Sequence, residues 1–189
     1  MSRIQRASEH LAMPWANGTG VTYQVATSPE GADLATFDWR ISMAEVGEDG
    51  PFSLFAGIDR VLTVLGPGDM RLFINGHEVL SRKFSPVSFS GDDDVLAELV
   101  DGPIVDLNVM TRRGRYTSAV DVQHIQGPVQ FAFDSTSLPL AVILDGQATT
   151  SDGDVLTSRD VVFVDDSISL DGDATIAIVT LHEAFGDDR

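Results

Sequence analysis

The chain has 189 residues, of which 43% are hydrophobic, so it is long enough to bury a substantial core. Twelve basic residues face 29 acidic ones, and the net charge of −17 opposes binding to nucleic-acid phosphates or to anionic lipid surfaces. No apolar run approaches the roughly 20 residues of a membrane span, and the N-terminal segment lacks the apolar core of a signal peptide. We therefore expect a cytoplasmic, acidic protein without nucleic-acid or membrane partners.

Short segments that alternate apolar and polar residues recur along the chain, separated by turns rich in glycine and aspartate. A helical turn is expected only near residues 6–13, because a sustained 3.6-residue apolar repeat is missing. Strands this short and this evenly spaced predict an all-β sandwich or barrel with little helix. The predicted strands are residues 21–27, 36–46, 59–66, 69–76, 77–81, 86–91, 95–100, 103–111, 116–125, 129–134, 140–146, 160–166 and 174–183.

The sequence also contains a weak internal repeat. Residues 60–89 and 140–164 both run through an apolar strand, a glycine turn, a short strand and a second apolar strand. This pattern predicts two copies of one β unit. The order of residues in "SDGDVLTSRDVVFV" resembles half of a cupin, a small jelly-roll barrel whose interior holds a ligand or metal. We therefore expect one bicupin unit over 1–189, with halves at about 10–115 and 116–189.

The strand "TFDWRISMAEV" has two distinct faces. Phe37, Trp39, Ile41 and Met43 form an apolar face that we expect to be barrel core, whereas Arg40 lies on the opposite face. An exposed ion pair between Arg40 and a neighbouring aspartate is worth only about 0 to 1 kcal/mol. An unpaired arginine inside a barrel costs several kcal/mol, so an interior Arg40 requires an acidic side chain or an anionic ligand.

Metal binding and the common forms of nucleophilic catalysis find little support. The absence of cysteine excludes disulfides and thiolate ligands, and the four histidines stand alone rather than in the paired spacing that metal-binding cupins use. The acidic clusters are interpreted as solvated turns rather than calcium loops. No nucleophile elbow or phosphate-binding loop occurs. We expect no metal and no cofactor.

Four segments together resemble the HutD/Ves family of bacterial proteins. They are "MPWANGTGVTYQV", "FDWRISMAEVGEDGPFSLFAGIDRVLTVL", "PVSFSGD" and "DGPIVDLNVMTRRGR", which cover the chain well from about residue 10 to residue 116. The resemblance implies a bicupin without catalytic metal. The family is associated with histidine utilisation, where it has been proposed to bind a small carboxylate such as N-formimidoyl-L-glutamate and to govern flux.

The matching motif positions supply the candidate ligand-binding residues. The family's basic residue after "MPW" is replaced here by Ala16. Arg40 would pair with the carboxylate of the ligand, Asn17 and Asn108 would hydrogen-bond to amide or imino groups, and Ser42 would assist. The remaining pocket residues carried over from the motifs are Trp15, Arg60, Phe89 and Met110.

Our leading hypothesis is a bicupin that binds a small carboxylate metabolite, regulates histidine utilisation and performs no chemistry. One alternative is a metal-independent isomerase or hydrolase with Asp106 as general base. Another is an interaction protein with a side-chain-filled barrel, and a homodimer is left open. For "TRRGR" we favour a solvated turn over a rim that attracts anions, and for Phe52 and Phe55 core over pocket wall.

Overall fold

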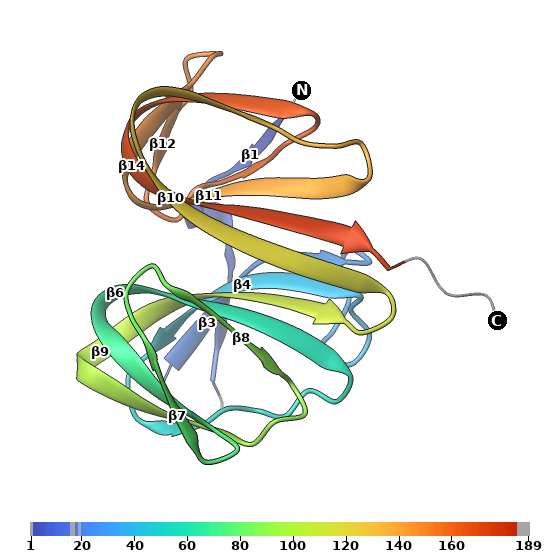
Figure 1. Cartoon of the computed structure of the whole chain (residues 1–189), viewed down its shortest axis with the longest axis vertical. Helices are drawn as coiled ribbons and strands as arrows, with labels where there is room; N and C mark the ends of the chain where they lie inside the picture. Colours follow the sequence, from blue (N-terminus) through green and yellow to red (C-terminus); the bar gives the residue numbers. More distant parts are fainter. Residues whose placement is uncertain (1, 16–17, 19, 185–189) are drawn as a thin grey trace. The chain divides into compact units, whose positions relative to one another are not determined.

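The computed structural model describes residues 2–15, 18 and 20–184. Apart from one short 3₁₀ helix, the regular structure of these residues is β, which confirms the predicted fold class. Figure 1 shows the elements, which are β1 (Arg3–Gln5), η1 (Ala7–Glu9), β2 (Leu11–Pro14), β3 (Gly20–Ser28), β4 (Trp39–Val46), β5 (Gly50–Pro51), β6 (Ile58–Ile74), β7 (His77–Ser81), β8 (Pro86–Ser90), β9 (Val95–Arg112), β10 (Tyr116–Ala132), β11 (Ser137–Thr150), β12 (Val155–Thr157), β13 (Val161–Phe163) and β14 (Ser167–Glu183). No helix among these residues is long and apolar enough to span a membrane.

The described residues divide into two units. The N-terminal barrel contains residues 11–117 together with 184, and the C-terminal barrel contains residues 2–10 and 118–183. The C-terminal barrel includes β1 because this strand pairs antiparallel with β13. The sequence patterns did not indicate this N-terminal strand.

The N-terminal barrel is built on an eight-stranded sheet with the order β2-β3-β4-β9-β6-β7, in which β5 pairs with β9 and β8 with β6. The two long strands β6 and β9 stay paired along most of their length, through register shifts on either side of Pro67. At Gly68 the two backbones approach so closely that an added Cβ would lie 2.2 Å from the carbonyl oxygen of Val100. The bend brings both ends of β6 and β9 around one buried cluster, which contains Val46, Leu62, Leu72 and other apolar residues.

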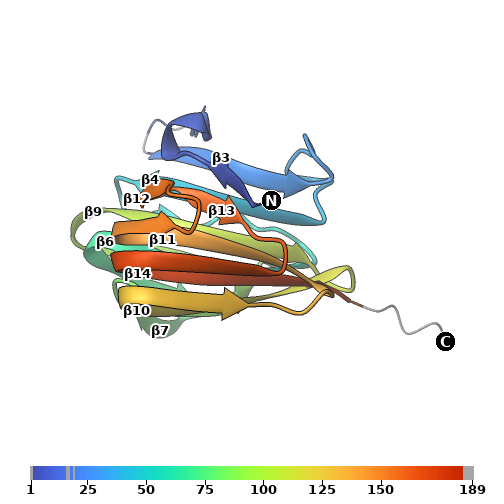
Figure 2. The same cartoon turned by 90° about the horizontal axis from the view of Figure 1, so that it is seen from above.

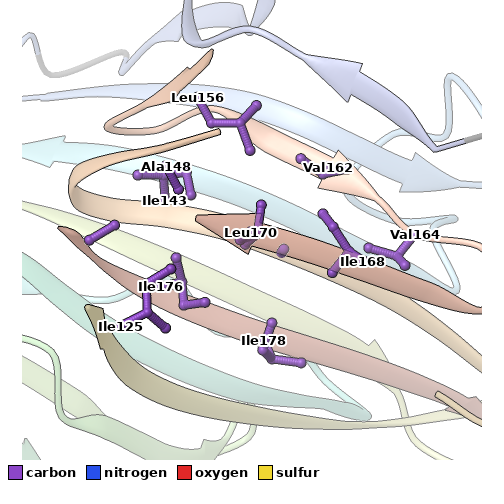
Figure 3. Packing of buried hydrophobic residues seen from close by; sticks show 12 residues of the cluster. Ile125, Ile143, Ala148, Leu156, Val162, Val164, Ile168, Leu170, Ile176 and Ile178 are labelled. Atoms are coloured by element: carbon purple, nitrogen blue, oxygen red, sulfur yellow. The ribbon is translucent and has the colours of Figure 1, made fainter. Parts of the chain in front are cut away.

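The C-terminal barrel is built on a six-stranded sheet with the order β1-β13-β11-β14-β10, and β12 pairs with β11. Figure 2 shows β14 between β11 and β10. The interior of this barrel is apolar (Figure 3), and the labelled side chains come from all of its strands except β1. They are Ile125, Ile143, Ala148, Leu156, Val162, Val164, Ile168, Leu170, Ile176 and Ile178.

The internal repeat corresponds to a repeated pairing pattern. In the N-terminal barrel β6 pairs with both β7 and β8, and in the C-terminal barrel β11 pairs with both β12 and β13. Each of these long strands also pairs antiparallel with a second long strand, β9 or β14. The two repeated segments therefore adopt the same connectivity, as the sequence predicted.

Candidate functional site

Buried polar side chains are concentrated in the N-terminal barrel. In the C-terminal barrel the buried polar residues are His10, Ser137 and Asp160, and none of them belongs to its apolar core cluster. Asp160 has a structural role, because its carboxylate accepts hydrogen bonds from the backbone N–H groups of Ala7 and Thr157. The N-terminal barrel therefore holds the candidate ligand site, because two arginines, an aspartate and an asparagine are buried in it.

The strand register arranges these residues in three parallel rows on one face of the sheet. The rows follow from the pairing of β3 with β4, β4 with β9, β9 with β6 and β6 with β8. Successive rows are two residues apart along each strand, or about 6.6 Å. The first row is Arg40, Met110, Arg60 and Phe89, the second is Gln24, Ser42, Asn108 and Leu62, and the third is Thr22, Ala44, Asp106 and Val64.

This face is the interior of the N-terminal barrel. Ala44, Val64 and Phe89 from the rows belong to its core cluster. Arg40 and Ser42 thus lie on an interior face that also carries core residues, in addition to the apolar face of β4 that we expected to be core. Ile41 and Met43 on that opposite face are also fully buried, so β4 is covered on both sides. Arginine is rarely buried on a strand that is covered on both faces unless its charge is paired, so Arg40 indicates a functional role.

Arg40 is buried and donates hydrogen bonds to neutral side chains. Its Nε donates a hydrogen bond to Oε1 of Gln24 at 3.2 Å, and its Nη1 donates to Oγ of Ser42 at 3.2 Å. Burial lowers the pKa of Arg40 below its ordinary value. The sequence prediction brought Arg40 and Ser42 together correctly, whereas Gln24 was not anticipated because it lies on a different strand.

Arg60 is buried in the same row, on the other side of Met110. Its Nε donates a hydrogen bond to Oδ1 of Asn108 at 3.4 Å. Its guanidinium carbon lies 5.0, 5.6 and 4.9 Å from the ring centroids of Phe52, Phe55 and Phe89, within the range of cation–π attraction. Burial lowers its pKa to about 10, opposed by the charge of Asp106 and reinforced by that of Arg40.

Phe52 and Phe55 are therefore wall residues around a cation as well as partners of the core. Both rings are half-buried, and both come from the segment that connects β5 to β6. Phe52 packs against the main core cluster and Phe55 against a small cluster that contains Phe37 and Met110. The segment is attached at its end, since the backbone N–H of Gly57 donates a hydrogen bond to Oδ1 of Asp92 at 3.1 Å.

Asp106 occupies the third row and is the most unusual side chain of the interior. It is 2% exposed, and its Oδ1 has no hydrogen-bond partner among the described residues. Burial raises its pKa from 3.8 to about 7, although the charge of Arg60 and a hydrogen bond with Asn108 act in the opposite direction. Burial therefore favours the neutral form of this carboxyl group.

Of the predicted site residues near the N-terminus, the structure describes Trp15 but not Asn17. Trp15 is half-buried against the core cluster, and its indole N–H donates a hydrogen bond of 2.8 Å to Oγ1 of Thr22, at the end of the third row. Asn17, predicted to bind a ligand, and Ala16 lie outside the described residues. The remaining predicted residues Arg40, Ser42, Arg60, Phe89, Asn108 and Met110 share one face of one sheet.

The arginines of "TRRGR" lie away from these rows and have partners of their own. Arg112 donates hydrogen bonds to the backbone carbonyl oxygens of Phe37 and Ala35. Arg113 forms ion pairs with Asp59 at 2.7 Å and with Asp92 at 3.0 Å. These contacts leave Arg113 as a surface residue that connects strand ends, in agreement with the interpretation of the segment as a charge-balanced turn.

Other sites are less well formed. Within the described part of the chain, no group of three or more histidine, aspartate or glutamate side chains is placed to hold a metal ion. A hollow of about 610 Å³ in the C-terminal barrel is lined by short polar side chains such as Thr149, Ser151 and Ser169. A second hollow, of about 550 Å³, lies beside Val46, Pro67 and Ile104 in the N-terminal barrel. Neither is lined by the buried arginines.

Comparison with known proteins gives the family. The HutD family profile matches residues 7–180. The chain belongs to the HutD family. Among solved HutD-like structures, the protein from Pseudomonas fluorescens SBW25 determined in a formate condition is 30% identical, with a TM-score of 0.83, over 97% of this chain and 99% of that one. A conserved protein of unknown function from Pseudomonas aeruginosa is 32% identical, with a TM-score of 0.85, over 96% and 99% of the two chains.

Two curated relatives of this HutD member align with a smaller part of the chain than the two solved structures do. An uncharacterised 21.2 kDa protein in the hutC 3′ region of Pseudomonas putida is 40% identical over 61% of this chain and 62% of its own length. Protein Ves of Citrobacter koseri is 38% identical over 57% and 56%. The chain thus spans about 60% of the length of these relatives. A bacterial pirin in complex with nickel is 11% identical, with a TM-score of 0.67, which shows a shared fold alone.

Proposed function

We propose that this HutD protein binds a small carboxylate metabolite in the interior of its N-terminal barrel, and that Arg40 and Arg60 hold the carboxylate. The observation that carries the proposal is the charge balance of the barrel interior. Neither Arg40 nor Arg60 forms an ion pair within the described residues, and each is only 6% exposed. Asp106 is the acidic residue of the three rows, and its own ionisation is opposed by burial.

The physical reason is the high energetic cost of a buried charge. A guanidinium removed from water costs several kcal/mol unless an opposite charge and hydrogen bonds compensate it. Here neutral oxygens satisfy three of the arginine N–H groups, and the rings of Phe52, Phe55 and Phe89 supply weak attraction. A carboxylate matches the planar donor fork of arginine and would supply the missing negative charge.

The biological context comes from the family. The association of the HutD family with histidine utilisation supports this context for the proposal, and so does the relative from the hutC 3′ region of Pseudomonas putida. An intermediate such as N-formimidoyl-L-glutamate carries the carboxylates that the arginines require. Binding without turnover would make the protein a sensor that regulates the pathway.

The proposal is tested by calorimetric titration with formate, pentanoate, glutarate and N-formimidoyl-L-glutamate. We expect wild type to bind members of this series and Arg40→Gln and Arg60→Gln each to lose at least tenfold in affinity. Arg71→Gln is the matched control, because Arg71 lies on the same sheet with its side chain 47% exposed. Binding of none of these carboxylates, or equal affinity in wild type and Arg40→Gln, would refute the proposal.

A second candidate is a metal-independent enzyme that uses Asp106 as general base. Two observations favour it: the unpartnered Oδ1, and a pKa of about 7, near the optimum for proton transfer at neutral pH. The same titrated samples decide between binding and catalysis. Incubation of each bound carboxylate with wild type and with Asp106→Asn, followed by mass spectrometry and by proton NMR in D₂O, would show conversion or solvent exchange only if Asp106 performs chemistry.

A further inference from the structure

The two arginines of the proposed site are enclosed. Arg40 and Arg60 are each 6% exposed, and Ser42 and Asn108 beside them are 2% and 8% exposed. Neither of the two hollows described above is lined by these residues. A carboxylate can therefore reach the arginines only when part of the barrel wall moves, as lids and loops do in many closed binding sites.

Residues 52–57, which we call the strap, form a part of this wall that lies outside the strands. Two of the three rings around Arg60 belong to the strap, Phe52 at 5.0 Å and Phe55 at 5.6 Å from the guanidinium carbon. The third ring, Phe89, lies on β8, which pairs with β6. The Arg60 end of the site is thus closed in part by side chains from a segment that belongs to no strand.

The other end of the site is closed by paired strands. Arg40 donates hydrogen bonds to Gln24 on β3 and to Ser42 on its own strand, β4. β3 pairs with β2 and β4, and β4 pairs with β3 and β9. Movement of these strands would break backbone hydrogen bonds on both of their edges. The Arg40 end is therefore the harder one to open.

Backbone hydrogen bonds attach the strap at Phe52 and Phe55. Their N–H groups donate to the carbonyl oxygens of Val95 and Gly91, each at 2.8 Å. Leu54, between them, is 68% exposed, so the tip of the strap buries little apolar surface. Such segments open at a lower free energy than paired core strands do, and the rest of the domain stays folded while they open.

The C-terminal end of the strap is held by Asp92. Its Oδ1 accepts a hydrogen bond of 3.1 Å from the backbone N–H of Gly57, and its Oδ2 accepts one of 3.0 Å from Nη1 of Arg113. Gly57 has a φ of 72°, in the left-handed region that favours glycine. The backbone at Gly57 thus has the freedom that a hinge requires, and the hydrogen bond to Asp92 restrains it.

We infer that the strap is the gate through which the carboxylate enters the barrel, and that Asp92 is the positioning residue that holds the gate closed. The inference rests on the proposed function, because it takes Arg40 and Arg60 as the carboxylate site. It adds the route of entry and the group that controls its rate. When the strap turns about Gly57, the rings of Phe52 and Phe55 leave Arg60, and the carboxylate replaces their weak attraction with an ion pair.

The first test needs no carboxylate. Phenylglyoxal modifies accessible arginines, and peptide mass spectrometry gives the rate at each one. Because the gate opens more often without the Asp92 hydrogen bonds, Arg60 should react about fivefold faster in Asp92→Ala than in wild type. In the control Asp94→Ala, an exposed position of the same turn, Arg60 should react at the wild-type rate. Arg71, whose side chain is 47% exposed, should react equally in all three proteins.

Hydrogen exchange distinguishes opening of the strap from unfolding of the barrel. In Asp92→Ala the backbone amides of Phe55 and Gly57 should exchange about fivefold faster than in wild type. The amides of Ile41 on β4 and Val109 on β9 should keep their wild-type rates. Equal acceleration on β4 and β9 would show that Asp92 only stabilises the barrel, and it would overturn the inference.

The second test measures binding kinetics by NMR line-shape analysis, for each of formate, pentanoate and glutarate that wild type binds. A gate that opens more often should raise the association and dissociation rate constants of Asp92→Ala together, each by about fivefold, and leave the dissociation constant within about twofold of wild type. Asp94→Ala should have wild-type rate constants.

The outcomes separate this inference from the proposed function. Unchanged modification of Arg60 in Asp92→Ala would overturn the gate whether or not carboxylates bind. Unchanged rate constants in Asp92→Ala, with binding that depends on Arg40, would overturn the gate and leave the carboxylate site intact. Failure of wild type to bind any of the titrated carboxylates would overturn the proposed function, and the gate for a carboxylate with it.

Discussion

Asp106 makes a quantitative prediction about stability without any ligand. Its pKa rises from 3.8 to about 7 because burial disfavours the charged carboxylate. Between these pH values the folded protein holds a proton that the unfolded chain has released, so the free energy of unfolding falls as the pH rises. One pH unit corresponds to about 1.4 kcal/mol, and the whole difference therefore amounts to about 4 kcal/mol.

The perturbation is Asp106→Asn, which keeps the shape of the side chain and removes its titration. The difference in the free energy of unfolding between this variant and wild type should shift in favour of the variant by about 4 kcal/mol from pH 4 to pH 7.5. The assay is urea unfolding followed by tryptophan fluorescence at pH 4, 5, 6, 7 and 7.5. Trp15 and Trp39 are the only tryptophans of the chain, and both lie in the N-terminal barrel, so the signal reports the unit that contains Asp106.

The control for this experiment is Asp94→Asn, the same chemical change at an exposed position of the same barrel. Its difference from wild type should stay constant over the same pH range. A difference between Asp106→Asn and wild type that does not change with pH would refute the reasoning. So would a difference that changes in the opposite direction, since that would mean that Asp106 is stabilised as a carboxylate by its neighbours.

Three further predictions concern packing and hydrogen bonding. Leu62→Ala, at a fully buried core position, should lower the free energy of unfolding by about 2 to 5 kcal/mol, whereas Leu54→Ala, at a site 68% exposed, should change it by less than about 0.5 kcal/mol in the same urea titration. Gly68→Ala should reduce the midpoint of thermal unfolding strongly because the new Cβ meets a backbone carbonyl at 2.2 Å, and Gly50→Ala, where the space is open, should not. Asp160→Ala should destabilise the C-terminal barrel by about 2 kcal/mol or more, because the hydrogen bonds to its carboxylate are lost. This destabilisation should diminish as the pH falls, since those bonds hold the pKa of Asp160 below its ordinary value. Hydrogen exchange of the β13 amides measures the destabilisation and its pH dependence.

The sequence predicted strands well and their ends poorly. The strand at residues 77–81 coincides with β7. The predicted strands 59–66 and 69–76 are one continuous strand, β6, because the Gly-Pro-Gly segment between them forms a bend within the strand rather than a turn. The same holds for residues 95–100 and 103–111 in β9. Turn-forming residues show where a backbone bends, but pairing with the partner strand decides whether it continues.

The candidate site was predictable along each strand and not across strands. Alternation alone places Arg40 with Ser42, and Asp106 with Asn108, on common faces. The register that sets Asn108 beside Ser42 is a property of the pairing between β4 and β9, which no local pattern encodes. For the same reason the loop residues Phe52 and Phe55 beside Arg60 could be assigned only by the structure, whereas Phe89 was carried over from the family motif.

The two barrels show why the polar rows point to function rather than to fold. The repeat gives both barrels the same pairing pattern, yet the buried polar residues described in the C-terminal barrel are His10, Ser137 and Asp160, without an arginine. The charged residue buried in the C-terminal barrel, Asp160, has an ion pair with Arg6, so a barrel of this connectivity closes without a buried arginine among its described residues. The N-terminal barrel buries the ionisable groups of Arg40, Arg60 and Asp106 at an energetic cost that its fold does not require. This energetic cost is explained if a carboxylate ligand supplies the negative charge that Arg40 and Arg60 require.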